Sequence, residues 1–305
     1  MPETETPPPA PQTTPPDLLI FGGGYLGQAA GREALRRGGT ATATSPQAER
    51  RAHLQDQGIT AIDPEDTLAL RDAVLRASAI LITVPPEPSG CPALRALLPA
   101  LSASGAYPDW IGYVSSSAVY GDRAGGWAFE DDPLNAASLN GARRVKAEHD
   151  WLDTGRGMGL TVQVFRLPAV YGPGRSPVDR IVAGTARRVI KPGQVFNRIH
   201  VEDAVAGFFA SMAHPHPGQA YTLADDEPAP AEDVLDWTAA MLGLPHLSDV
   251  PLEDPSVSDG MRRFYNDNKR LSNARAKAEL GWRPRYPSWR DGLLPLIRQE
   301  KGQEA

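Results

Sequence analysis

Cysteine is nearly absent from this sequence, whose 305 residues include only Cys91. One thiol excludes a disulfide framework and a cysteine zinc site, and it fits a reducing compartment such as the cytoplasm. We expect no metal site. No apolar run approaches the roughly 20 residues that a membrane helix needs. Basic residues are outnumbered, giving a formal net charge of −6 at pH 7, which argues against nucleic acid or an anionic membrane surface as the main partner.

Apolar residues are scarce in the first segment, Met1 to Pro16, where seven residues are prolines. A secretory signal needs a basic start and an apolar centre, and this segment has neither. Its composition predicts a disordered or polyproline II-like tail. The whole chain is long enough for a large core, either in one domain or in a large domain with a smaller one.

The most informative stretch runs from Leu18 to Gly27, with the sequence Leu-Leu-Ile-Phe-Gly-Gly-Gly-Tyr-Leu-Gly. Four apolar residues end abruptly in glycines, and a helix-permissive run follows up to Arg37. The pattern predicts a strand, a tight turn and a helix. The turn carries the spacing Gly22-x-Gly24-x-x-Gly27, which is typical of dinucleotide binding when it joins a strand to a helix.

Each glycine of this turn has a physical role in that hypothesis. Gly22 permits the tight turn, Gly24 lets the backbone approach a pyrophosphate, and Gly27 lets the helix pack against the strand. The N-terminus of the helix, expected from Gln28, offers unpaired N–H groups and a positive dipole end to the phosphates, and Tyr25 and Leu26 within the turn are further candidate cofactor contacts. The alternative is a glycine-rich turn that binds nothing.

The next strand, Thr40 to Thr44, indicates which dinucleotide is bound. An acidic residue usually ends this strand in NAD-binding units, where it contacts the adenosine ribose. Here Ser45, Pro46 and Gln47 follow instead. We therefore expect Thr44 and Ser45 to contact a 2′-phosphate, with Arg50 or Arg51 reaching back from the following helix, and we favour NADP while NAD stays possible. Both arginines could equally be solvated helix residues.

The pattern of alternating strands and helices predicts a doubly wound parallel α/β sheet of the Rossmann type. Further strands are expected at residues 59–62, 79–84, 110–114 and 160–167, and helices at 67–77 and at 92–101 with an interruption near Pro99. Because such sheets bind ligands at the carboxyl ends of their strands, Val84 and Pro85 should lie beside the cofactor.

The strand at 110–114 runs into Ser115-Ser-Ser-Ala-Val-Tyr-Gly-Asp122. Here the chain resembles the extended short-chain dehydrogenases/reductases, the superfamily of NAD(P)-dependent epimerases and dehydratases. The resemblance implies that Ser116, four residues before the tyrosine of Val-Tyr-Gly, helps to polarise a substrate carbonyl or hydroxyl. Alternatively, the three serines only cap the end of a strand.

The family's next element is a helix bearing Tyr-x-x-x-Lys, with a glutamate four residues later. The matching segment reads Asn140-Gly-Ala-Arg-Arg144-Val-Lys-Ala-Glu148. Alignment on Glu148 puts Asn140 at the tyrosine position and Arg144 at the lysine position. An amide cannot replace a tyrosine as acid or base, whereas Arg144 could still bond the nicotinamide ribose. The sequence is therefore similar to atypical members that lack the catalytic tyrosine.

The resemblance continues through Pro168-Ala-Val-Tyr-Gly-Pro-Gly-Arg175 and implies that Pro168 passes near the nicotinamide. Within Asn197 to Asp203, His200 is interpreted as a structural, hydrogen-bonded histidine, and Asp203 as a residue that caps or orients the segment. A helix is expected at 231–242, another in the segment 270–281, and a last one from Ser288 to about Gln299.

These observations predict a mainly NAD(P)-binding domain at residues 17–175 and a mainly substrate-binding small lobe at 176–305, some of which returns to the Rossmann core. The expected protein is a cytoplasmic monomer or homodimer, with a small molecule as its partner. One hypothesis is an oxidoreductase or epimerase that acts on a small hydroxyl or keto compound, with sugar-like compounds among the candidates. The other is a non-catalytic NADP(H)-binding protein with a regulatory or redox-sensing role.

Overall fold

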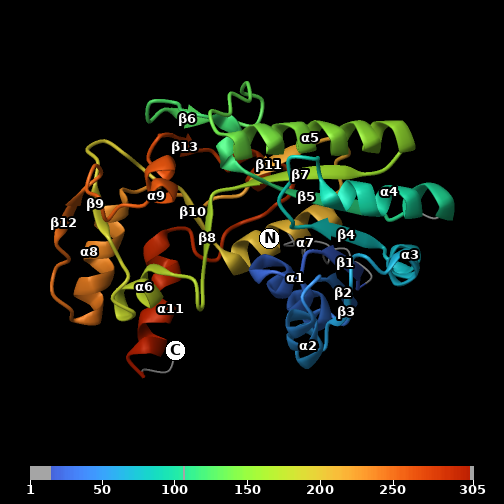
Figure 1. The fold of residues 1–305 in the computed structure, drawn as a ribbon, viewed down its shortest axis with the longest axis horizontal. Coiled ribbons are helices and arrows are strands. Elements are labelled where there is room, and N and C mark those ends of the chain that lie inside the picture. The colour runs from blue at the N-terminus through green and yellow to red at the C-terminus, as the bar shows by residue number, and fades with distance from the viewer. Residues whose placement is uncertain (1–14, 106, 303–305) are drawn as a thin grey trace, which may run out of the picture.

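The computed structural model describes residues 15–105 and 107–302, so nearly all of the expected tail lies outside the described residues. Seven parallel strands form the central sheet, in the order β11-β7-β5-β4-β1-β2-β3 (Figure 1). Their bounds are β1 Asp17–Phe21, β2 Thr40–Thr44, β3 Thr60–Ile62, β4 Ala79–Ile82, β5 Trp110–Ser116, β7 Val162–Leu167 and β11 Ala220–Thr222. The prediction of a Rossmann-type parallel sheet is confirmed.

Helices cover both faces of this sheet. One face packs against α1 Tyr25–Arg36, α2 Ala48–Asp56, α7 Val201–Ala213 and α10 Ala274–Glu279. The other packs against α3 Thr67–Arg76, α4 Pro92–Ser104 and α5 Leu139–Met158. With both faces covered, β4 is apolar along its whole length, and every one of its residues is buried.

The chain reverses its direction of travel across the sheet beside β1. It proceeds outward from β1 to β2 and β3, then returns to add β4 on the other side of β1. In doubly wound folds such a switch point opens a crevice at the carboxyl ends of the strands, which is where ligands bind. The glycine turn follows β1 directly, so it lies at this switch point.

The remaining elements form a smaller lobe and its connections to the sheet, on the left of Figure 1. Short parallel pairs join β8 Ala169–Tyr171 to β10 Arg198–His200, β9 Arg188–Ile190 to β12 Asp249–Pro251, and β6 Trp127–Ala128 to β13 Arg270–Leu271. The other elements are the 3₁₀ helix η1 Ser117–Tyr120 and the helices α6 Pro177–Val182, α8 Ala231–Leu242, α9 Asp259–Phe264 and α11 Trp289–Glu300. No helix in the described ranges is both long and apolar enough to cross a bilayer.

Two expected helices differ from the sequence-based interpretation. Helix α4 is continuous, although an interruption was expected near Pro99. A proline removes one helical hydrogen bond, but Leu97 and Leu101 on either side of it are fully buried against the sheet, and this packing holds the helix together. The segment 270–281 begins as the short strand β13, so its helix α10 spans only 274–279.

Candidate functional site

The turn after β1 is held in place by the two neighbouring strands. The Gly22 N–H donates to Thr44 Oγ1 at 3.0 Å, and the Thr83 hydroxyl donates to the Gly22 carbonyl at 2.7 Å. Gly22 has φ +120°, and a Cβ built on it would lie 2.5 Å from Thr83 Oγ1. Only glycine fits both the backbone conformation and the space at this position.

The start of α1 leaves room for a ligand where the motif requires it. A Cβ on Gly27 would lie 2.1 Å from the Gly22 carbonyl oxygen, so the helix packs directly on the turn, whereas a Cβ on Gly24 would meet nothing within 4 Å. The first helical bond runs from Gln28 N to Gly24 O, and no side chain that the structure describes caps the helix. The N–H groups of Tyr25 and Leu26 therefore have no helical acceptor, and the turn fits the pyrophosphate of a dinucleotide.

Among the described residues, those at the end of β2 and in the segment after it comprise several structural contacts and one arginine without an ion pair. Thr44 and Ser45 are both buried, and the Thr44 hydroxyl already accepts the Gly22 N–H. Arg51 Nη1 pairs with Asp63 Oδ2 at 2.7 Å and donates to the Ser45 carbonyl at 2.8 Å. Arg50 is exposed and makes no ion pair within the described part of the chain. Of the two arginines considered from sequence, Arg51 has its charge balanced by Asp63, and Arg50 has no such partner in the described ranges.

Other predicted cofactor contacts lie at the carboxyl ends of the central strands. Val84, just beyond β4, lies against the turn, because a Cβ on Gly22 would come within 2.8 Å of Val84 Cγ1. Pro85 is the exposed residue that follows it, and Pro168 links β7 to β8. Since the sheet is parallel throughout, these positions all fall on its carboxyl edge.

Ser116 is the last residue of β5 and is only partly exposed. Its Oγ accepts a hydrogen bond from the Ala118 N–H at 3.2 Å, as the N-cap of η1. Accepting this bond leaves the hydroxyl proton available to a substrate oxygen. The serine therefore caps a local turn and can still act as a donor.

Helix α5 presents Asn140, Arg144 and Glu148 at intervals of four residues, which places them along one face. Its first turn lies against η1, because a Cβ on Gly141 would be 2.9 Å from the Ala118 carbonyl oxygen. Asn140 is exposed at this end of the helix. Arg144 Nη1 donates to the Val114 carbonyl at 3.1 Å, two residues before Ser116. Arg144 thus lies beside the end of β5, whereas the Asn140 amide oxygen accepts a hydrogen bond from Arg143 Nη1 at 3.5 Å.

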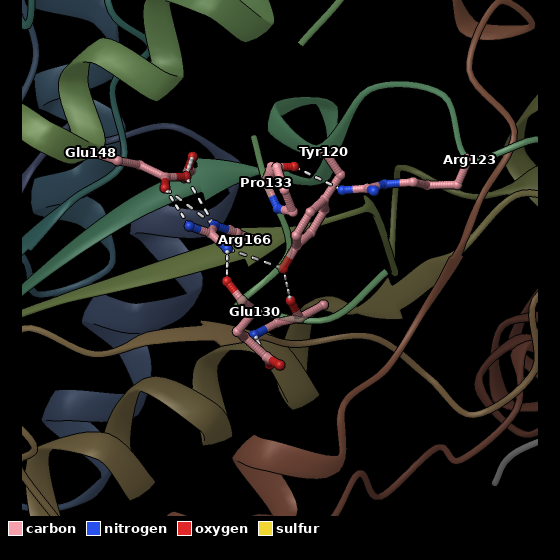
Figure 2. A network of polar contacts seen from close by, with 8 residues as sticks. Tyr120, Arg123, Glu130, Pro133, Glu148 and Arg166 are labelled. Carbon is pink, nitrogen blue, oxygen red and sulfur yellow. Dashed lines mark hydrogen bonds and ion pairs between the residues drawn. The ribbon is translucent and has the colours of Figure 1, made fainter. Parts of the chain in front are cut away.

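Glu148 of this face forms a buried ion pair with Arg166, which the sequence-based interpretation did not include. Arg166 Nη2 bonds Glu148 Oε2 at 2.8 Å, and its Nε lies 3.1 Å from the same oxygen (Figure 2). The Glu148 carboxylate also accepts the hydroxyl proton of Ser115, next to Ser116. The pair joins α5 to β5 and β7. An arginine within an apolar strand was the available signal, because a buried charge requires a partner.

The same arginine extends the network toward the small lobe, as Figure 2 shows. Its Nη1 donates to the Tyr120 hydroxyl at 3.2 Å and to the Glu130 carbonyl at 2.8 Å. The Tyr120 hydroxyl also shares a 2.7 Å hydrogen bond with Thr222. Tyr120 is fully buried, and burial raises its pKa. Its hydroxyl therefore belongs to the core network and is not presented to the site.

His200 and Asp203 organise the start of α7. His200 Nδ1 accepts the Glu202 N–H at 3.3 Å, and burial lowers the pKa of the ring to about 4. The Asp203 carboxylate accepts the N–H groups of Arg285 and Tyr286 at 2.6 and 3.1 Å, which ties a distant loop to the helix. The neutral, buried histidine is a structural cap, as the sequence indicated.

The fold and the glycine turn define a Rossmann-type protein whose turn is typical of dinucleotide binding and whose strand β5 ends in a serine. The profile of the "NAD dependent epimerase/dehydratase family" matches residues 95–224. Protein YeeZ of Escherichia coli K12 is 30% identical over 284 residues, covering 88% of this chain and 96% of YeeZ. The chain belongs to the NAD-dependent epimerase/dehydratase family of extended short-chain dehydrogenases/reductases.

Other relatives differ in how much they share with the chain. A Streptomyces "3-diazoavenalumate denitrifying reductase" is 32% identical over 176 residues, which span 54% of this chain and just 57% of the reductase. A functionally unknown conserved protein from Silicibacter pomeroyi is 38% identical, with a TM-score of 0.86 over 94% of this chain and 99% of that one. The fold is shared with the NAD-bound dTDP-glucose 4,6-dehydratase DesIV of Streptomyces venezuelae. That enzyme is 20% identical, with a TM-score of 0.76 over 93% of this chain and 97% of that one.

Proposed function

We propose that this protein is an NADP(H)-dependent oxidoreductase that acts on a small hydroxyl or keto compound, with sugar-like compounds among the candidates, and that it works without the usual tyrosine. The observation that carries the proposal is the turn after β1. Its backbone conformation, open space at Gly24 and uncapped helix suit a pyrophosphate. The family to which the chain belongs supports the same cofactor class. A bound nicotinamide would supply or accept a hydride.

The preference for NADP rests on charge at the end of β2. No carboxylate follows this strand directly, and a carboxylate there would repel a 2′-phosphate. Arg50 remains as an uncompensated cation on α2, whereas the charge of Arg51 is balanced by Asp63. Ser45 is proposed as the second 2′-phosphate contact through its hydroxyl proton, because its Oγ accepts the Gln47 N–H while its backbone N–H donates to the Ile62 carbonyl.

At the reacting end, Ser116 would donate its free hydroxyl proton to the substrate oxygen and so stabilise charge that develops there. Arg144 would hold the nicotinamide ribose with those N–H groups not used by the Val114 carbonyl. Asn140 can donate a hydrogen bond to the substrate but cannot exchange a proton at neutral pH. The substrate proton would therefore come from water or from another side chain.

A relative named as a reductase of 3-diazoavenalumate supports the reductive direction. The second candidate, a non-catalytic NADP(H)-binding regulator, is favoured by the exposed asparagine at the tyrosine position. The two functions differ in turnover. A regulator would bind NADPH and convert no substrate.

The test follows NADPH oxidation by absorbance over a panel of small carbonyl compounds, with the wild type, Ser116→Ala and Asn140→Tyr/Arg144→Lys. General acid–base catalysis supplies roughly 10²–10⁴-fold, so we expect slow wild-type turnover that the double variant raises on carbonyl substrates. Ser116→Ala should abolish it. Fast wild-type turnover with a pH profile showing one tyrosine-like group would refute the assignment of Asn140. If the wild type binds NADPH but turns over none of the compounds, the result would favour the regulator.

A further inference from the structure

A loop from the small-lobe side of the molecule is anchored at the start of α1. The Tyr25 hydroxyl donates to the Pro173 carbonyl at 3.1 Å, across 148 positions of sequence. Within the loop, the Arg175 N–H donates to the Gly172 carbonyl at 3.0 Å, and the Gly172 N–H donates back to the Arg175 carbonyl at 3.3 Å. The loop is therefore a tight turn tied to the first residue of the helix whose N–H groups face the pyrophosphate position.

Gly172 shows how closely this loop is held. A Cβ built on it would lie 2.7 Å from the Tyr25 hydroxyl, 2.8 Å from Val201 Cγ1 and 3.3 Å from His200 Nε2. Those atoms belong to the beginnings of α1 and α7. The loop is thus wedged between two helix N-termini, which leaves little freedom in where the next residues are placed.

Arg175 is the charged residue that this loop delivers. Its guanidinium carbon lies 5.6 Å from the centre of the Tyr25 ring, and its side chain is exposed. Two carboxylates in this region have partners of their own: Asp179 forms the capping box of α6 with Ser176, and Glu202 pairs with Arg285 at 3.2 Å. Among the described residues, no carboxylate forms an ion pair with Arg175.

A fixed cation beside the positive end of a helix is electrostatically unfavourable unless an anion joins them. We propose that Arg175 binds the pyrophosphate of the dinucleotide from the side opposite the glycine turn, with Tyr25 holding the loop in position. This inference rests on the proposed function. It makes the segment 172–175 part of the cofactor site, so that a contact from the small-lobe side closes over the bound dinucleotide.

The experiment measures dissociation constants of NADPH, NADH and ADP-ribose for the full chain, by nucleotide fluorescence and by calorimetry. Arg175→Gln removes the charge, and we expect affinity for all three ligands to fall by roughly tenfold, as for a charge-assisted hydrogen bond at an accessible site. Arg175→Lys should recover part of the loss. Tyr25→Phe keeps the ring but frees the loop, and it should weaken binding by a smaller factor. Added salt should narrow the difference between wild type and Arg175→Gln.

Arg71→Gln is the matched control, because it removes an exposed arginine from α3, on the other face of the sheet. It should leave all three affinities unchanged. Unchanged affinities in a folded Arg175→Gln variant would overturn the inference and leave the proposed function standing. A loss confined to NADPH would place Arg175 at the 2′-phosphate and also overturn it. A wild-type protein that binds none of the three ligands would instead refute the proposed function.

Discussion

Removing one partner of the buried Glu148–Arg166 pair should be strongly destabilising. The two side chains are 1% and 6% exposed, so neither charge can regain water when the other is lost. Glu148→Gln keeps the shape of the side chain and leaves the guanidinium unpaired. Breaking such a pair costs about 3–5 kcal/mol, mostly as the penalty of an uncompensated buried charge.

This cost can be converted into a melting temperature. Unfolding entropy is about 2.1 cal/mol/K per residue, or about 0.64 kcal/mol/K for a chain of this length. The loss therefore corresponds to a fall of about 5–8 °C, which differential scanning calorimetry measures directly. The double variant Glu148→Gln/Arg166→Met should lose less than the sum of the two single variants, because no buried charge is then left unpaired.

The same helix offers a control with similar geometry and different burial. Lys146 Nζ lies 2.7 Å from Asp150 Oδ2, but these side chains are 69% and 30% exposed. Exposed pairs contribute about 0.2–1 kcal/mol, so Lys146→Gln should lower the melting temperature by less than about 2 °C. If Glu148→Gln melts no lower than Lys146→Gln, the reasoning from burial is wrong.

Three further predictions concern pH and the cofactor. Burial raises the pKa of Asp225 to about 8, so the stability that its protonated form contributes is present at low pH and is lost as pH rises through 8. Asp225→Asn should therefore flatten the dependence of the melting temperature on pH between pH 4 and 8, and an unchanged profile would contradict this. A Cβ on Gly24 would meet no atom of the described residues within 4 Å, so Gly24→Val should fold yet lose NADPH binding in calorimetry; retained affinity would remove the ligand from this turn. Ser45→Asp should shift preference from NADPH toward NADH, and tighter NADH binding by the wild type would refute the preference.

Local patterns in the sequence were sufficient to predict the elements whose conformation depends mainly on neighbouring residues. The strand, glycine turn and helix that the structure places at 17–36 could be predicted, because the positive φ at Gly22 and the close packing at Gly27 both require glycine and lie only five positions apart. Helix α8 was predicted at its observed bounds, 231–242, and it ends at a glycine with φ +75°. The order of strands and helices then implied the parallel sheet.

The partners of individual side chains were decided only by the tertiary structure. The sequence presented Arg50 and Arg51 as equivalent, and the parallel register of β2 and β3 brought Asp63 to Arg51 alone. The link from Tyr25 to Pro173 likewise arises because the glycine turn and the loop after β8 meet at one edge of the sheet. Such contacts join positions far apart in the chain, and the arrangement of strands and loops in the tertiary structure determines which of them form.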